Sequence, residues 1–300
     1  SLEVCPVCGV GKENFVPVDA EESSYRNDTS SFYVILGGGA AGYYAASAIR
    51  ERDRTGSIVM ISDEPYRPYN RPMLTKSIMA DLTEDQIAIA EESWFEQQNI
   101  HLLLGKKVTG IDTENKEVVL DGDMKLAYTK LIYALGSECF IPPIPGHDKE
   151  GVIAIRRLAD TKKIEGLLPD VKHVAVIGGG VLGLEAAWEM KRAKREVTVL
   201  ELAPQLMGRQ LDEGASDMLK TISEAQGIQI RTGVQIQEIQ GEGRAAGVKL
   251  ADGEVIPAEL VIVSAGVRAN TAVAQAAGIE TDRAVVVNEK METSVPDVYA

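Results

Sequence analysis

The chain has 300 residues, of which 45% are hydrophobic and 25% charged, and its formal net charge is −14. This length suggests about two domains of globular composition. The negative charge argues against nonspecific binding to nucleic acid, which needs a basic surface, and no apolar run is long enough to cross a membrane. Because three cysteines do not make a disulfide framework, we expect a reducing, cytoplasmic setting.

The N-terminal segment differs in character from the rest of the chain. Cys5 and Cys8 form a CxxC pair within residues 1–18, which are rich in turn-forming residues. Residues 19–30 are polar, which favours a linker.

A glycine fingerprint occurs twice, as GGGAAG at residues 37–42 and as GGGVLG at residues 178–183. Each copy follows a short apolar run, typical of a buried strand, and precedes a sequence that predicts a helix. In this setting the first glycine makes a tight turn, the second admits a pyrophosphate, and the third lets helix and strand pack closely. Two such copies predict two dinucleotide sites in one chain.

The segments after the first fingerprint continue an alternating β/α pattern. Residues 57–62 predict a strand, residues 81–98 a helix with Trp94 and Phe95 in the core, and residues 116–128 a small antiparallel hairpin. Residues 131–136 favour a buried strand that ends in a glycine turn.

A proline-rich stretch at 141–146 (IPPIPG) cannot form a helix or a central strand, so it predicts a crossing between domains. Beyond it, residues 197–201 and 259–266 repeat the strand pattern of the first half. The sequence therefore predicts an α/β protein with two Rossmann-like dinucleotide-binding domains.

Acidic residues follow each fingerprint at about the 20-residue distance at which an acid binds the adenosine ribose. Asp63 and Glu64 are the candidates in the first half, and Glu201 is the candidate in the second. No Arg or Lys directly follows Glu201. A carboxylate there accepts a hydrogen bond from a 2′-hydroxyl and repels a 2′-phosphate, so NADH is favoured over NADPH.

Residues 62–76 (SDEPYRPYNRPMLTK) resemble the FAD-site segment of pyridine-nucleotide-dependent flavoprotein reductases, in the branch of rubredoxin–NAD reductases, ferredoxin reductases and nitrite-reductase flavin subunits. Further motifs, from 133–136 (YALG) to 293–300 (TSVPDVYA), extend the resemblance over residues 31–300. It implies a glutathione-reductase-like fold of two three-layer ββα domains. The FAD-binding domain would be 31–145, the NAD(H)-binding domain 146–267, and 268–300 a truncated return to the FAD domain.

The same resemblance implies the residues that contact each cofactor. Those for FAD would be Gly37, Gly39, Ala41, Gly42, Asp63 or Glu64, Arg71, Lys76, Val108, Ala134 and Gly136. Those for NADH would be Gly178, Gly180, Leu182, Gly183, Glu185, Glu201 and Gly266. Lys76 and Glu185 would pair at the junction of flavin and nicotinamide and act in catalysis.

The destination of the electrons is suggested by the cysteines. In the superfamily that this chain resembles, disulfide reductases carry a redox cysteine pair in the helix that corresponds to 43–50, and peroxidases and oxidases keep one cysteine in the segment that corresponds to 69–72. Neither segment has a cysteine here, and Cys139 is typical of an ordinary half-buried thiol, so the resemblance favours a one-electron carrier over dithiol chemistry. Residues 5–15 resemble the second half of a rubredoxin. Cys5 and Cys8 would supply two of the four thiolates that its iron needs, with the other pair missing.

The resemblance thus implies an NADH-dependent flavoprotein reductase that passes electrons through FAD to rubredoxin or a similar carrier. Two alternatives stay open: an NADH oxidase or diaphorase, and a nucleotide-binding redox sensor without fast turnover. A homodimer of the full-length protein is a further expectation.

Overall fold

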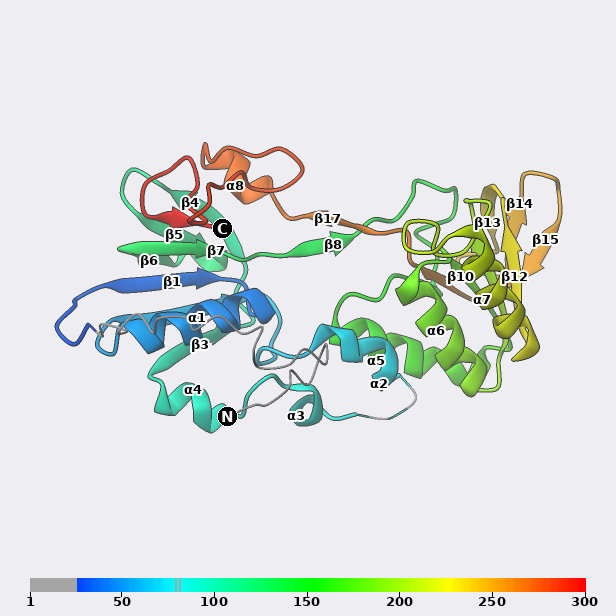
Figure 1. The fold of residues 1–300 in the computed structure, drawn as a ribbon, viewed down its shortest axis with the longest axis horizontal. Helices are drawn as coiled ribbons and strands as arrows, with labels where there is room; N and C mark the ends of the chain where they lie inside the picture. Colours follow the sequence, from blue (N-terminus) through cyan, green and yellow to red (C-terminus); the bar gives the residue numbers. More distant parts are fainter. Residues whose placement is uncertain (1–25, 79, 81) are drawn as a thin grey trace, which may run out of the picture.

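The computed structural model describes residues 26–78, 80 and 82–300, which form two similar halves joined by a narrow ribbon (Figure 1). Each half contains a five-stranded parallel sheet with helices on one face and a three-stranded antiparallel sheet on the other. The predicted three-layer ββα arrangement is therefore confirmed in both halves.

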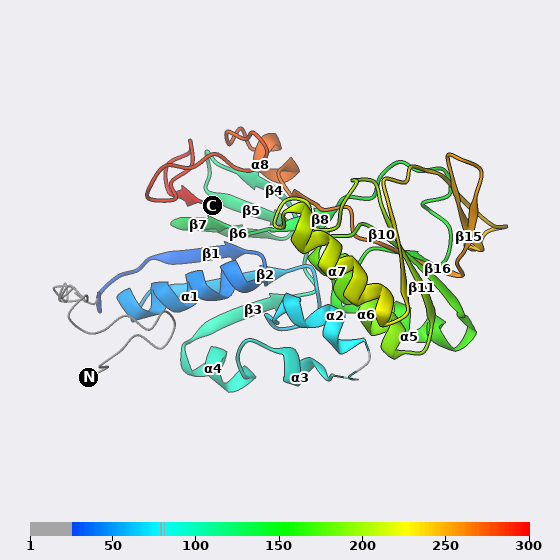
Figure 2. The same ribbon diagram turned by 45° about the vertical axis from the view of Figure 1, so that its right-hand side comes forward.

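The sheet of the first half has the strand order β18-β7-β1-β2-β3. Helices α1 and α4 lie on one face in both ribbon views, and the sheet β4-β5-β6 lies on the other with α8 (Figures 1 and 2). The elements are β1 (Phe32–Leu36), α1 (Ala40–Arg52), β2 (Ser57–Ser62), α4 (Glu92–Gln97), β3 (Ile100–Leu104), β4 (Val108–Asp112), β5 (Glu117–Leu120), β6 (Lys125–Ala127), β7 (Lys130–Tyr133), α8 (Ala272–Ala276) and β18 (Val298–Tyr299).

Strand β1 shows why this sheet is buried on both faces. Its side chains alternate, so Val34 and Leu36 pack toward the antiparallel sheet while Ile35 packs toward α1 and α4, where Phe95 is also buried. Continuous apolar strands of this kind are typical of parallel sheets covered on both sides.

The second half repeats the design with the strand order β12-β11-β10-β16-β9. Val174 and Val176 on β10 pack toward the helices, and Ala175 and Ile177 toward the sheet β13-β14-β15. Its elements are β9 (Val152–Ile153), α5 (Leu158–Leu167), β10 (His173–Ile177), α6 (Val181–Arg192), β11 (Glu196–Glu201), α7 (Glu213–Ala225), β12 (Ile228–Thr232), β13 (Ile236–Gln240), β14 (Gly247–Leu250), β15 (Val255–Pro257) and β16 (Leu260–Val263).

The two halves are connected by β8 (Ser137–Cys139) and β17 (Val267–Ala269), which pair antiparallel (Figure 1). The proline-rich residues 141–146 form no helix or strand and lead from β8 into the second half. We propose that this ribbon marks the domain boundaries near residues 145 and 267. After it, the chain returns to the first sheet, where Val298 pairs with Leu131.

The prediction of one helix over residues 81–98 was wrong. The structure has two short helices, α3 (Glu84–Ile87) and α4, separated by the non-helical residues 88–91. The Ile89 N–H donates to the Pro68 carbonyl at 2.9 Å, and the Asn70 N–H donates to the Ile87 carbonyl at 2.8 Å. Because these backbone groups bond to another segment, they cannot continue the helical hydrogen-bond pattern.

Among the described residues, no helix has both the length and the apolar character needed to cross a membrane.

Candidate functional site

Three connected cavities follow the boundary between the two halves. The first, of about 510 Å³, lies beside the first glycine loop. The second, of about 1070 Å³, lies beside the second glycine loop. A smaller cavity of about 190 Å³ shares Arg71 and Arg156 with the first and Leu182, Ser264 and Gly266 with the second. The two dinucleotide-type sites therefore meet at one junction.

The first glycine loop is tight where packing requires it and open where a ligand would approach. Gly37 has a φ of +119°, and a Cβ there would lie 2.0 Å from the Ala134 carbonyl oxygen. A Cβ on Gly42 would lie 2.1 Å from the Gly37 oxygen, whereas a Cβ on Gly39 would meet nothing within 4 Å. Gly39 also caps α1 without any side-chain hydrogen bond, so the helix N-terminus keeps free N–H groups that suit a phosphate.

The second glycine loop has the same geometry. Gly178 has a φ of +112°, and a Cβ on Gly183 would lie 2.0 Å from the Gly178 oxygen. Gly180 caps α6 without a side-chain bond, and a Cβ there would meet nothing within 4 Å. Both loops therefore fit the pyrophosphate of a dinucleotide.

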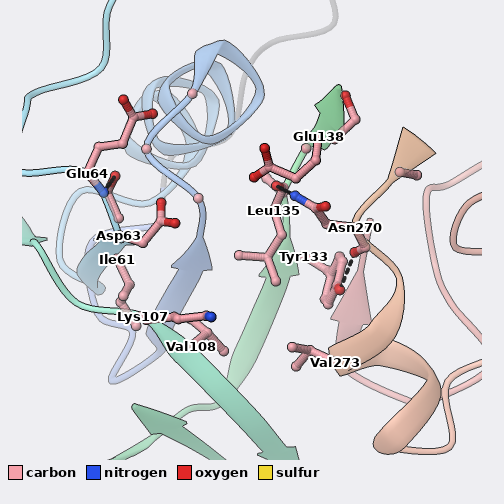
Figure 3. A pocket seen from close by; sticks show the side chains of 18 of the residues that line it. Ile61, Asp63, Glu64, Lys107, Val108, Tyr133, Leu135, Glu138, Asn270 and Val273 are labelled. Atoms are coloured by element: carbon pink, nitrogen blue, oxygen red, sulfur yellow. Dashed lines mark hydrogen bonds between the residues drawn. The ribbon is translucent and has the colours of Figure 1, made fainter. Parts of the chain in front are cut away.

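The consecutive acids Asp63 and Glu64 point in different directions. Figure 3 shows Asp63 directed into the first cavity and Glu64 turned away from its centre. The Glu64 carboxylate is buried, and it accepts hydrogen bonds from Arg71 at 2.6 Å and from the Tyr69 hydroxyl at 2.8 Å. Asp63 is therefore the better placed of the two to meet a ribose hydroxyl.

Arg71 lies at the first cavity and the junction, and it begins the short 3₁₀ helix Arg71–Met73. Besides Glu64 it contacts the Tyr69 hydroxyl at 2.9 Å and the Arg156 carbonyl at 2.7 Å. Burial of the Tyr69 hydroxyl raises its pKa well above the ordinary value, so this phenol stays protonated. A guanidinium held by three partners is well fixed for binding an anion.

The expected pairing of Lys76 with Glu185 does not form, and Glu185 lines none of the three cavities. Both are described residues, yet the structure forms no ion pair between them, and Lys76 is exposed on the short helix α2 (Leu74–Ser77). Instead, the buried Thr75 hydroxyl donates to Glu185 Oε2 at 2.9 Å. Glu185 is thus positioned by α2, through the residue before the lysine.

Glu201 lies in the wall of the second cavity. One of its carboxylate oxygens accepts a hydrogen bond from the Gly179 N–H at 2.5 Å, and the other from the Ala203 N–H at 2.7 Å. The backbone therefore holds a carboxylate beside the second glycine loop.

The other expected residues divide between cavity walls and packing positions. Val108, Ala134 and Gly136 line the first cavity, and Leu182 and Gly266 line the second. Gly42 and Gly183 are buried and serve the close packing of loop and helix. Ala41 is exposed in the first turn of α1 and lines neither cavity. Cys5 and Cys8 lie outside the described residues.

Several residues that line the two cavities were not predicted from the sequence. Lys106, Lys107, Arg156 and Arg157 add positive charge to the first cavity, and Arg209 lies in the second. They stand outside the glycine motifs, so only the fold reveals their position.

Cys139 is the single cysteine among the described residues. It lies at the junction cavity, with its Sγ 3.6 Å from the Ile155 carbonyl oxygen. Burial raises the pKa of this thiol, which keeps it in the unreactive protonated form. A dithiol pair does not occur in the described part of the chain.

Comparison with known proteins gives consistent results. A family model described as pyridine nucleotide-disulphide oxidoreductase matches residues 32–300. Nitrite reductase [NAD(P)H] of Bacillus subtilis is 41% identical over 81% of this chain and 30% of its own length. Rubredoxin-NAD(+) reductase of Pseudomonas putida is 34% identical over 86% of this chain and 68% of its own.

Solved structures agree with this similarity. The ferredoxin reductase for the CYP199A2 system from Rhodopseudomonas palustris has 32% sequence identity and a TM-score of 0.85, over 90% of this chain and 67% of that one. The chain thus spans between about a third and two thirds of the length of these three proteins.

Proposed function

The chain belongs to the pyridine nucleotide-disulphide oxidoreductase family, and on this premise we propose that the protein is an NADH-dependent FAD reductase that supplies electrons to a one-electron carrier. The junction cavity is the observation that carries this proposal. It shares walls with both dinucleotide sites, so the reactive ends of two bound dinucleotides could meet there.

FAD fits the first cavity. An open Gly39, a helix N-terminus and the fixed guanidinium of Arg71 suit a pyrophosphate, and Asp63 suits the adenosine ribose. Bound FAD would supply the conversion between two-electron transfer from a nicotinamide and one-electron transfer to a carrier. Around it, Thr75 in the wall of the junction cavity would hold the adjoining Glu185 carboxylate, and the apolar walls of this cavity would keep water away.

NADH fits the second cavity. The Glu201 carboxylate is held by two backbone N–H groups and could still accept a hydrogen bond from a ribose 2′-hydroxyl. A 2′-phosphate would bring like charge against this fixed carboxylate, which supports a preference for NADH over NADPH.

A rubredoxin-type protein is the acceptor we propose. A relative that is 34% identical bears the name rubredoxin-NAD(+) reductase. Cys139 is the one described cysteine and has no thiol partner there, which favours one-electron transfer over disulfide reduction. For Cys5 and Cys8 the prediction stays as it was: they would be two of the four thiolates of a rubredoxin-type iron site, with the other pair missing.

The proposal is tested by following NADH oxidation by the whole FAD-loaded protein, with and without added rubredoxin. We expect rubredoxin to raise the rate well above that with oxygen alone, and NADPH to be a poorer donor. Equal rates with and without rubredoxin would favour an oxidase. Reduction by NADH without further turnover would favour a redox sensor.

A further inference from the structure

Arg157 connects three segments around the first cavity. It lies just before α5, in the second half of the chain, and its side chain reaches back to the first half. Its Nη1 donates to Asp63 Oδ2 at 2.8 Å, and its Nη2 donates to Glu138 Oε1 at 2.5 Å. All three residues line the cavity. Figure 3 shows Asp63 and Glu138 on opposite sides of this space.

The surrounding backbone fixes where Arg157 stands. On one side, the Arg156 carbonyl accepts a hydrogen bond from Arg71 at 2.7 Å. On the other, the Leu158 N–H donates to the Tyr69 hydroxyl at 3.2 Å, and the Leu158 side chain is buried. Because both neighbours are bound to the first half, the backbone of Arg157 is fixed there, and its guanidinium is held by the two carboxylates.

Arg71 and Arg157 each form an ion pair with one of the two consecutive acids. Arg71 holds Glu64, which is buried, and Arg157 holds Asp63, which faces the cavity. Although burial disfavours a charged guanidinium, the hydrogen bonds to Glu138 and Asp63 raise the pKa of Arg157 above its ordinary value. Arg157 therefore stays charged, and it occupies only one of the two oxygens of Asp63.

We propose that Arg157 is a positioning residue of the FAD site, which orients Asp63 so that its second carboxylate oxygen accepts a hydrogen bond from the adenosine ribose. This inference rests on the proposed function, since it takes FAD as the ligand of the first cavity. It also means that the adenosine end of the site depends on a side chain from the second half.

The test is a double-mutant cycle on FAD affinity with the whole protein. FAD is removed, and its rebinding is followed by the quenching of flavin fluorescence in wild type, Arg157→Ala, Asp63→Asn and the double variant. We expect Arg157→Ala to weaken FAD binding by about threefold to tenfold, the size of one lost charge-assisted contact that is partly exposed. In the Asp63→Asn background the same substitution should change the affinity by less than about twofold.

Two further variants test whether the loss of FAD affinity comes from the positioning of Asp63 or from a general effect of charge or folding. Arg231→Ala removes an equal charge from an exposed ion pair with Glu254, away from both dinucleotide cavities, and should leave FAD affinity unchanged. Arg157→Lys keeps the charge but reaches one carboxylate at a time, so it should restore part of the affinity. The melting temperature of each apo-protein shows whether folding is intact.

The outcomes are distinguishable. An equal loss of affinity in the wild-type and Asp63→Asn backgrounds, or no loss at all, would overturn the role of Arg157 while leaving the FAD site in place. A wild-type protein that fails to bind FAD would instead overturn the proposed function on which the inference rests.

Discussion

Replacing Gly180 by alanine adds one methyl group at the second glycine loop without disturbing the fold. Gly180 is the N-cap of α6, with φ −81° and ψ 179°, a conformation that alanine adopts without strain. The new Cβ would meet no protein atom within 4 Å. The loss of a good N-cap residue costs about 0.5–1 kcal/mol, and the reduced entropy of the unfolded chain offsets a similar amount. The free energy of unfolding should therefore change by less than about 1 kcal/mol.

The binding of NADH should change much more. The space around Gly180 is where a pyrophosphate would approach the N–H groups at the start of α6. A methyl group there would remove about one charge-assisted hydrogen bond, a loss of roughly 1.5–3 kcal/mol. This corresponds to a dissociation constant raised by about 10- to 150-fold.

The reciprocal substitution makes the experiment specific. Gly39 has the equivalent place at α1, with φ −96° and open space around it, so Gly39→Ala should weaken FAD binding and spare NADH. Gly166→Ala is the matched control, because Gly166 is exposed within α5 and a Cβ there would meet nothing within 4 Å. It should stabilise the helix by up to about 1 kcal/mol and affect neither ligand.

The measurements are calorimetric titration of NADH, fluorescence titration of FAD and the melting temperature of each variant. An unchanged NADH affinity in Gly180→Ala, with the melting temperature preserved, would refute the assignment of this loop to the pyrophosphate. Equal weakening of both ligands by both substitutions would refute the division of the two sites.

Three further outcomes follow from individual contacts. Thr75→Val removes the hydrogen-bond donor to Glu185. Stopped-flow spectroscopy should show flavin reduction by NADH slowed about tenfold, with little change in the KM for NADH. An unchanged rate would show that this hydrogen bond has no role in the reaction. Glu201→Gln should narrow the preference for NADH over NADPH by about tenfold in kcat/KM, because the repulsion of the 2′-phosphate is removed. Hydrogen bonds from Thr29 and other donors outweigh burial and lower the pKa of Asp53 from 3.8 to about 2. Since the folded-state pKa is the lower one, this carboxylate contributes about 2 kcal/mol above pH 4 that is lost as the pH falls toward 2. Urea denaturation between pH 4 and pH 2 should show a loss of stability that is smaller in Asp53→Asn than in wild type by about this amount, since Asp297, whose pKa is also lowered to about 2, still titrates in both.

Both glycine loops could be predicted from the sequence because every part of each motif is local. The strand, the turn and the first helical turn follow one another, and Gly37 and Gly178 show the positive φ that such a turn needs. The helix predicted over 81–98 failed for the opposite reason. What interrupts it is hydrogen bonding with Pro68 and Asn70, which no pattern within the segment indicates.

The hydrogen bond to Glu185 shows how the geometry of one helical turn decides which of two neighbouring residues makes a contact. The family resemblance implied Lys76 as the partner of Glu185. Successive residues on a helix point about 100° apart, so only one of two neighbours on α2 can face α6. The structure turns the buried Thr75 hydroxyl toward Glu185 and leaves Lys76 exposed. The resemblance therefore indicated the segment that contacts Glu185, but not the residue that donates the hydrogen bond.

The acids Asp63 and Glu64 could not be separated by their distance from the glycines, since both stand at the end of the same strand. The distinction comes from the arginines that approach them, and one of these, Arg157, is 94 residues from Asp63 in the chain. Arg71, in the first half, donates to the carbonyl of Arg156, which lies 85 residues later in the chain. Each half of the chain thus supplies an arginine to the other at the same cavity. The proposed FAD site would consequently depend on both halves, and a change that loosens the segment before α5 should weaken FAD binding even when the first glycine loop is intact.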